Sequence, residues 1–310
     1  MSEIIVENLT KKYGNQTAID GISFQVNKGE IIGFIGPNGA GKSTTMKIMT
    51  SYMAPTSGNI IIGGEKVGHD TKKIKKGIGY LPENNPLYAD MAIVDYLKFC
   101  ASVQGVTKKE VPARIKTMIQ ICGLNPEKHK RINELSKGYR QRVGLAQAII
   151  HNPGILILDE PTTGLDPNQI IEIRNLIKEL GKEKTIILSS HILPEVEAVC
   201  DRIIIINQGK IVADDTFEAM NRMANQQEIL ILQIESENNA NPEEDLLSLS
   251  AVEQVTSVIG KTGFFEVKSK SGESAKKSIF DLCVKNKWYL LEMTSIKSSL
   301  EDVFREVTVK

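Results

Sequence analysis

One loop constrains the fold of this chain more than any other feature of its sequence. The short apolar run Ile31–Ile35 passes directly into a glycine-rich segment, which is followed by a helical stretch, Ser43–Met53. The segment matches the pattern GxxxxGK[ST] at every fixed position and reads Gly36-Pro37-Asn38-Gly39-Ala40-Gly41-Lys42-Ser43. A strand, such a loop and a helix, in that order, are typical of α/β proteins that bind nucleoside triphosphates.

The residue types in this loop account for phosphate binding. Glycines let the backbone curl so that several N–H groups point at one phosphate chain, and the helix that follows adds the positive end of its dipole. Lys42 can reach the β- and γ-phosphates, and the Ser43 hydroxyl can ligate Mg²⁺. The alternative is a chance glycine-rich turn before a helix. The full match favours ATP and Mg²⁺ bound on residues 36–44, a range that ends at Thr44.

Strands and helices alternate along the first two thirds of the chain. Antiparallel strands are expected at Ile4–Leu9 and Ile22–Val26, and Ile155–Leu158 and Thr185–Leu188 read as buried parallel strands. Residues 86–150 have a mostly helical pattern. This order predicts an α/β domain with a parallel sheet, an antiparallel β subdomain and a helical subdomain over about residues 86–150.

The composition changes after about residue 220. Residues 221–227 are mostly polar, and the remainder predicts the order β, α, β, β, α, β, α, with the last helix at Leu300–Val307. That order is typical of a small α+β, ferredoxin-like unit. We therefore expect an ATP-binding domain over residues 1–220 and an accessory domain over residues 221–310.

Composition excludes several classes of partner and site. The 38 basic and 38 acidic residues balance, and aromatic residues make up 5% of the chain, so neither charge nor base stacking favours nucleic acid. The four cysteines form no CxxC pair, which favours buried thiols in a reducing compartment. The segment Met1–Ile5 has no signal-peptide pattern, and no apolar run is long enough to span a bilayer. If the protein acts at a membrane, we expect it to do so through a partner protein.

Two acids end the apolar run Ile155–Leu158. At a strand end beside the phosphate loop, Asp159 can hold Mg²⁺ and Glu160 can activate a water molecule. Alone, an apolar run that ends in two acids is also typical of an ordinary strand that ends at a loop. Other motifs must therefore decide between a metal and catalytic site and a simple strand end.

A third motif lies between the first two. Residues 135–142 read Leu-Ser-Lys-Gly-Tyr-Arg-Gln-Arg and precede a helical stretch. With the other two motifs, this segment resembles the signature of the ATP-binding cassette (ABC) family, although Lys137 and Tyr139 replace the usual glycine and glutamine. The resemblance implies that Ser136 and Gly138 form a second anion site, facing the γ-phosphate bound by the other subunit of a dimer. Ser136 could also be only a helix cap.

Four more residues take roles from the same resemblance. Tyr13 would stack on adenine, or be an ordinary strand aromatic. Asp166 would belong to a loop that links the two subunits' sites, or cap the next helix. His191 would contact the γ-phosphate. Glu83 stands where the family usually has glutamine; it can ligate Mg²⁺ or hold a water, but when ionised it cannot donate a hydrogen bond.

The resemblance implies an ATPase subunit that powers substrate export through a partner membrane permease. Glu160, His191 and Lys42 would be catalytic, and Ser43, Asp159 and Glu83 would hold Mg²⁺. A second, identical or paralogous ATPase subunit would complete the dimer at the cytoplasmic face of the cell membrane, with no nucleic acid. Residues 79–87 and 299–308 resemble the type-2 exporter class, and within it the ATPase subunit associated with gliding motility.

Other functions of the same cassette are the alternatives. A soluble ABC-type ATPase acting on ribosomes or other macromolecules would usually carry two cassettes and a basic linker, but this chain has one cassette and no net charge. A DNA-repair or chromosome ATPase would need a long coiled coil between Lys42 and Ser136, and no long heptad run appears there. A nucleotide-binding regulator without catalysis is the last alternative. The presence of all four expected residues, Lys42, Asp159, Glu160 and His191, argues against it.

Overall fold

The structure is a computed structural model that describes residues 2–68, 71–224, 228–235, 242–258, 260–270, 272–296 and 304. The chain divides into two compact units, Met1–Asp215 and Thr216–Lys310. Within the described residues, no helix is both long enough and apolar enough to cross a bilayer. All four cysteines are buried thiols.

A six-stranded sheet forms the centre of the first unit. Its order is β10-β9-β3-β8-β7-β6, with the strands β3 (Ile31–Ile35), β6 (Ile78–Leu81), β7 (Ile155–Asp159), β8 (Thr185–Ser190), β9 (Arg202–Asn207) and β10 (Lys210–Thr216). From β9 to β6 every neighbouring pair is parallel. Parallel strands end at one edge, so the segments that follow β3, β7 and β8 meet there.

A second, antiparallel sheet packs over the helix that follows the phosphate loop. It has the order β2-β1-β4-β5, formed by β1 (Ser2–Tyr13), β2 (Gln16–Asn27), β4 (Ser57–Ile62) and β5 (Glu65–Lys66). One hydrophobic core joins Ile4 and Ile60 of this sheet, Met46 of α1 (Lys42–Met49) and Ile157 of the central sheet. The helix is thus clamped between two sheets, which fixes the position of its first residue, Lys42.

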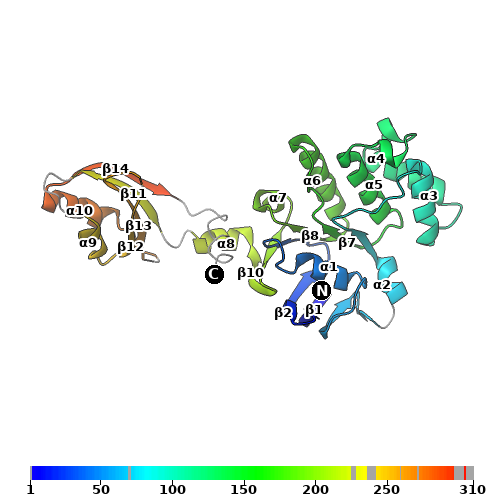
Figure 1. Cartoon of the computed structure of the whole chain (residues 1–310), viewed down its shortest axis with the longest axis horizontal. Coiled ribbons are helices and arrows are strands. Elements are labelled where there is room, and N and C mark those ends of the chain that lie inside the picture. The colour runs from blue at the N-terminus through cyan, green and yellow to red at the C-terminus, as the bar shows by residue number, and fades with distance from the viewer. Residues whose placement is uncertain are drawn as a thin grey trace. The chain divides into compact units, whose positions relative to one another are not determined.

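Helices cover the other face of the central sheet. Figure 1 shows α3 to α6 on the side opposite to β1 and β2. These helices are α3 (Ile93–Val103), α4 (Val111–Ile121), α5 (Lys137–Ile149) and α6 (Pro167–Gly181), with α7 (Leu193–Glu197) after β8 and α2 (Thr71–Gly77) before β6. Two 3₁₀ turns, Asn125–Glu127 and Ile132–Glu134, lead into α5. The α/β cassette with its antiparallel and helical subdomains is therefore confirmed.

The second unit has the predicted ferredoxin-like order. After α8 (Phe217–Ala224) it runs β11 (Ile229–Glu235), α9 (Pro242–Leu247), β12 (Val252–Ser257), β13 (Phe264–Ser269), α10 (Lys276–Asn286) and β14 (Tyr289–Ile296). The sheet order is β12-β13-β11-β14, with antiparallel pairing. Leu232, Val267 and Ile279 lie in a core of its own. Helix α8 includes residues 221–224, the first part of the mostly polar segment 221–227. The helix predicted at Leu300–Val307 lies outside the described residues except for Phe304.

The substitution Leu232→Ala tests whether the second unit has an independent core. Leu232 is fully buried in β11, so its truncation should lower the free energy of unfolding by about 2–5 kcal/mol. Trp288 is the only tryptophan of the chain and is buried in the same core, so its fluorescence during denaturant unfolding reports on this unit alone. ATP binding should be unchanged, because the glycine-rich loop 36–43 belongs to the first unit and packs against that unit's own hydrophobic core.

Leu291→Ala is the matched control, since the Leu291 side chain is 55% exposed on β14. It should change the unfolding free energy by no more than about 0.5 kcal/mol. Equal losses in both variants, or weaker ATP binding in Leu232→Ala, would contradict an independent core.

Candidate nucleotide site

The glycine-rich loop leaves β3 at Ile35 and enters α1 at Lys42. Gly41 precedes the helix with a φ of 112°, which side chains other than glycine rarely allow. A Cβ atom on Gly36 would lie 2.2 Å from the carbonyl oxygen of Ile206 on β9. The loop therefore lies directly against the neighbouring strand, and the glycines are needed for that approach.

A cavity of about 410 Å³ opens over this loop. Residues 38–44 of the loop line it, together with Ala18, Glu83, Glu160, Thr163 and His191. The topology thus brings most of the predicted site residues to one place, although they come from four separate parts of the sequence.

The ammonium group of Lys42 is buried, with 6% of the residue exposed. Its Nζ donates to the carbonyl oxygen of Gly36 at 2.7 Å and to that of Pro37 at 3.3 Å, and it lies 3.6 Å from Oε1 of Glu160. A buried cation needs such partners. Because two of the partners are neutral carbonyls of the loop itself, a phosphate group arriving in the cavity can replace them with a stronger, charge-assisted contact.

Oxygen ligands suited to Mg²⁺ lie beside the loop. Ser43 Oγ donates to Oδ1 of Asp159 at 3.1 Å, and Ser189 Oγ donates to the same oxygen at 2.6 Å. Asp159 is 1% exposed. A hydroxyl and one carboxylate next to a phosphate site match the way proteins hold Mg²⁺, which keeps its other positions for water and phosphate oxygens. These residues therefore fit the metal.

Glu160 is held in a backbone conformation that few residues adopt. Its φ is 50°, in the left-handed region that costs a non-glycine residue about 1–3 kcal/mol. The Glu160 N–H donates to Ser189 Oγ at 3.0 Å, Thr163 Oγ1 donates to Oε2 at 3.1 Å, and Nδ1 of His191 lies 2.9 Å from the same Oε2. These contacts fix the buried carboxylate while Oε1 stays on the side of Lys42.

The predicted signature residues lie apart from this cavity. Ser136 is the N-cap of α5, where its Oγ accepts from the Tyr139 N–H at 3.4 Å. Asp166 is the N-cap of α6, and its Oδ1 accepts from the Gln169 N–H at 3.0 Å. Both capping interpretations therefore hold in the single chain. Gly138 is buried in the first turn of α5, and none of the three lines the described cavity.

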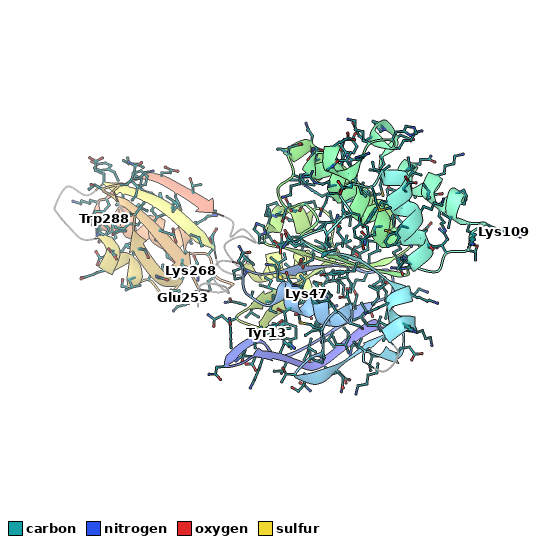
Figure 2. The ribbon with its side chains drawn as sticks, turned by 45° about the vertical axis from the view of Figure 1, so that its right-hand side comes forward. Tyr13, Lys47, Lys109, Glu253, Lys268 and Trp288 are labelled. Atoms are coloured by element: carbon teal, nitrogen blue, oxygen red, sulfur yellow. The ribbon has the colours of Figure 1, made fainter. Side chains whose placement is uncertain are left out.

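Tyr13 also lies outside the lining of this cavity. Figure 2 labels it on the antiparallel sheet. Its hydroxyl is 3.1 Å from Sδ of Met53, the Lys11 ammonium lies 5.4 Å from its ring centre, and 47% of the residue is exposed. An exposed ring at the end of β1 can stack on a base, and in this chain it contacts Lys11 of its own strand and Met53 after α1.

Two residues of the site were missed from the sequence. Ser189 pairs in register with Asp159 across β7 and β8. Its hydroxyl donates to the Asp159 carboxylate and accepts from the main-chain N–H of Glu160. The polar pair Ser189–Ser190 at the end of an apolar strand was the available signal. Thr163 gave no signal beyond its position three residues after Glu160.

Comparisons with known proteins agree with this geometry. A family model described as ABC transporter matches residues 19–163. The chain is 37% identical over 311 residues to the bacitracin transport ATP-binding protein BcrA of Bacillus licheniformis, covering 98% of this chain and 97% of that protein. It is 36% identical over 306 residues to the uncharacterized ABC transporter ATP-binding protein YhcH of Bacillus subtilis (strain 168), with 98% and 95% covered.

A solved structure is similar as well. A dimeric ATP-binding cassette in a post-hydrolysis state, bound to ADP and Pi, has a TM-score of 0.63 and 25% identity to this chain, and the match covers 69% of this chain and 98% of that one. These relatives give no support to the narrower resemblance to gliding-motility ATPases. By its similarity over nearly its full length, the chain belongs to the ATP-binding proteins of ABC transporters, and it is an ATPase subunit that hydrolyses ATP for transport.

Proposed function

We propose that this protein binds Mg-ATP over residues 36–44, pairs head to tail with a second ATPase subunit, and drives export through a membrane permease at the cytoplasmic face. The observation that carries the proposal is the arrangement around one cavity of two buried charged groups, Lys42 and Glu160, with the more exposed His191 beside them. This arrangement places three groups where a γ-phosphate would lie: the Lys42 cation, the fixed Glu160 carboxylate and a ring nitrogen of His191.

Each of these residues has a separate task in hydrolysis. Lys42 leaves the carbonyl groups of its own loop and stabilises negative charge on the phosphates. Glu160 Oε1 accepts a proton from the attacking water, since Oε2 is already held by Thr163 and His191. His191 holds the carboxylate through Nδ1 and can contact the γ-phosphate with its other nitrogen.

Ser43 and Asp159 would hold Mg²⁺, and Glu83 lies on the same cavity wall. When bound, the metal supplies positive charge next to the β- and γ-phosphates. Ser43 and Asp159 then orient the phosphate chain over the loop. Glu83, a carboxylate in place of the usual amide, adds an acceptor and, when ionised, no donor.

A second subunit supplies the remaining groups. Ser136 and Gly138 lie at the N-terminus of the 13-residue helix α5, where unpaired N–H groups and the helix dipole favour an anion. Because neither residue lines the cavity of its own chain, we place them against the nucleotide of the partner. The dimeric relative described above supports this arrangement. The partner can be a second copy or a paralogue.

Glu160→Gln tests the catalytic carboxylate. The amide keeps the shape of the side chain but cannot accept the proton of the water, so ATP turnover should fall on the order of 10²–10⁴-fold. ATP binding should persist, and the variant should accumulate as an ATP-stabilised dimer in size-exclusion chromatography. Glu179→Gln is the control, because Glu179 lies on the exposed surface of α6, where it pairs with Lys182. Near-normal turnover in Glu160→Gln would remove Glu160 from this role.

A second cavity, of about 500 Å³, adjoins the nucleotide site. Ser43, Glu83 and Asp159 line it from the side of the first cavity, and Tyr52, Gln104 and His151 line its outer parts. The hydroxyl of Tyr80 and Nδ1 of His151 are buried there without a hydrogen-bond partner among the described residues. Burial lowers the pKa of His151, so its ring is neutral near pH 7.

Three exposed aromatic residues, Tyr52, Tyr88 and Phe99, define a surface that we consider together with this cavity. Tyr52 itself lines the cavity. Tyr52 is 73% exposed, Tyr88 is 56% exposed and Phe99 is 43% exposed, and the rings of Tyr88 and Phe99 are 5.4 Å apart. Aromatic residues of this kind carry much of the binding energy at protein interfaces. We assign this surface to the permease, because it adjoins Glu83 and can therefore transmit a change at the nucleotide.

Phe99→Asp tests the permease surface. The charge should weaken binding of the ATPase to its permease by at least about tenfold, which corresponds to 1.4 kcal/mol, while the ATPase activity of the isolated protein stays unchanged. Co-purification of the complex and a detergent binding titration measure the effect. Val212→Asp is the matched control, since Val212 is 41% exposed on β10. Equal binding by Phe99→Asp and wild type would exclude this surface.

The class of substrate is inferred from one relative. BcrA is named for bacitracin transport, and its match runs over nearly the whole of both chains. We propose that the permease partner of this protein exports a peptide antibiotic of that kind. The substrate itself would contact the permease and not this subunit.

A further inference from the structure

Glu195 of helix α7 is a buried acid to which the proposed hydrolysis assigns no task. The residue is 8% exposed. Its Oε2 accepts a hydrogen bond from Thr162 Oγ1 at 2.5 Å, and Ser190 Oγ lies 3.5 Å from the same oxygen. Thr162 and Ser190 are themselves buried. Because a buried carboxyl group is costly without such partners, these three groups form one polar cluster inside the first unit.

The two partners of Glu195 belong to the chain segments that carry the catalytic pair. One of them directly precedes Thr163, whose hydroxyl donates to Glu160 Oε2 at 3.1 Å. The other directly precedes His191, whose Nδ1 lies 2.9 Å from the same oxygen. Glu195 itself is not among the described residues that line the nucleotide cavity. It therefore joins, from outside that cavity, the two segments that converge on the Glu160 carboxylate.

Helix α7 gives Glu195 a fixed support. Val196, the next residue, is fully buried, and its Cγ1 lies 1.9 Å from the place where a Cβ atom of Gly33 would stand. The valine side chain thus fills the space that the missing side chain of Gly33 leaves on β3, and this contact fixes α7 on the central sheet. Because β3 runs into the glycine-rich loop, Glu195 and the phosphate-binding residues are held by the same sheet.

We infer that Glu195 is a positioning residue for ATP hydrolysis. Its carboxylate holds the segment that follows Glu160 against the segment that precedes His191. The inference rests on the proposed roles of these two residues. The left-handed backbone of Glu160 persists only where surrounding contacts hold it, and the hydrogen bond from Thr162 to Glu195 anchors the chain two residues further on. Without this bond the catalytic carboxylate is still present, but its Oε1 is no longer aligned with the attacking water.

Thr162→Val tests this role in the full-length protein, because valine has nearly the shape of threonine but cannot donate to Glu195. Turnover at saturating ATP should fall by about 10- to 100-fold, since a misplacement of about 1 Å can cost on the order of 100-fold. The ATP dissociation constant should stay unchanged, because Lys42 and the glycine-rich loop keep their contacts. Thr162→Ser retains the hydroxyl and should keep wild-type turnover. Glu197→Gln, at an exposed residue of the same helix, is the matched control and should also behave as wild type.

A double variant separates positioning from a loss of stability. Thr162→Val alone leaves a buried carboxylate without its donor, which lowers stability. In Thr162→Val with Glu195→Met, apolar side chains of similar size replace both polar partners, so the thermal midpoint should return to near the wild-type value. Turnover should stay about 10- to 100-fold low, because the directional bond is still missing. Recovery of turnover together with stability would overturn the inference and leave Glu195 a structural residue only.

The remaining outcomes distinguish this inference from the proposed function. On a Glu160→Gln background, Thr162→Val should lower the residual turnover no further, because its effect passes through Glu160; a further loss of about tenfold or more would overturn the inference. If Glu160→Gln itself keeps near-normal turnover, the proposed catalytic carboxylate is wrong and the inference falls with it. If Glu160→Gln loses turnover as expected but Thr162→Val keeps wild-type turnover, only the positioning role of Glu195 is overturned.

Discussion

Two opposite charges buried at one sheet edge determine most of this site. Lys42 and Glu160 lie 3.6 Å apart, each about 6% exposed, and an uncompensated charge at that depth would be strongly destabilising. The loop carbonyls of Gly36 and Pro37 compensate the cation, and Thr163 and His191 compensate the carboxylate. Because two of these partners are neutral carbonyls on a loop with room above it, the arrangement is stable by itself and still able to accept a phosphate.

The parallel sheet makes this arrangement possible. Strands β3, β7 and β8 end at the same edge, so Lys42, Asp159 and Ser189 meet although more than a hundred residues separate the first from the others. Helix α1 is clamped between two sheets, which fixes Lys42 and Ser43 against the acids of β7. The left-handed backbone at Glu160 turns its carboxylate into the cavity, and the neighbouring Ser189 hydroxyl holds that turn.

Local patterns predicted much of the fold and of the site. The helical region after β6, the order of the second unit and the positions of Asp159, Glu160 and His191 at strand ends follow from periodicity and motif. The short strands β5 and β6 were missed because two to four residues carry too little pattern. The roles of Thr163, Ser189 and Glu195 depend on tertiary contacts. Tyr13 and Asp166 gave patterns that fit two roles, and the structure of one chain shows the local role of each.

A structure of the Glu160→Gln variant with Mg²⁺ and ATP tests the central claim most directly, because it records where the buried ammonium of Lys42 goes. The account predicts that Lys42 Nζ leaves the carbonyl oxygens of Gly36 and Pro37, which it contacts at 2.7 and 3.3 Å without nucleotide, and binds the phosphates, with Ser43 and Asp159 at the metal. Nucleotide bound while Lys42 stays on the Gly36 carbonyl, or bound away from residues 36–44, would contradict it.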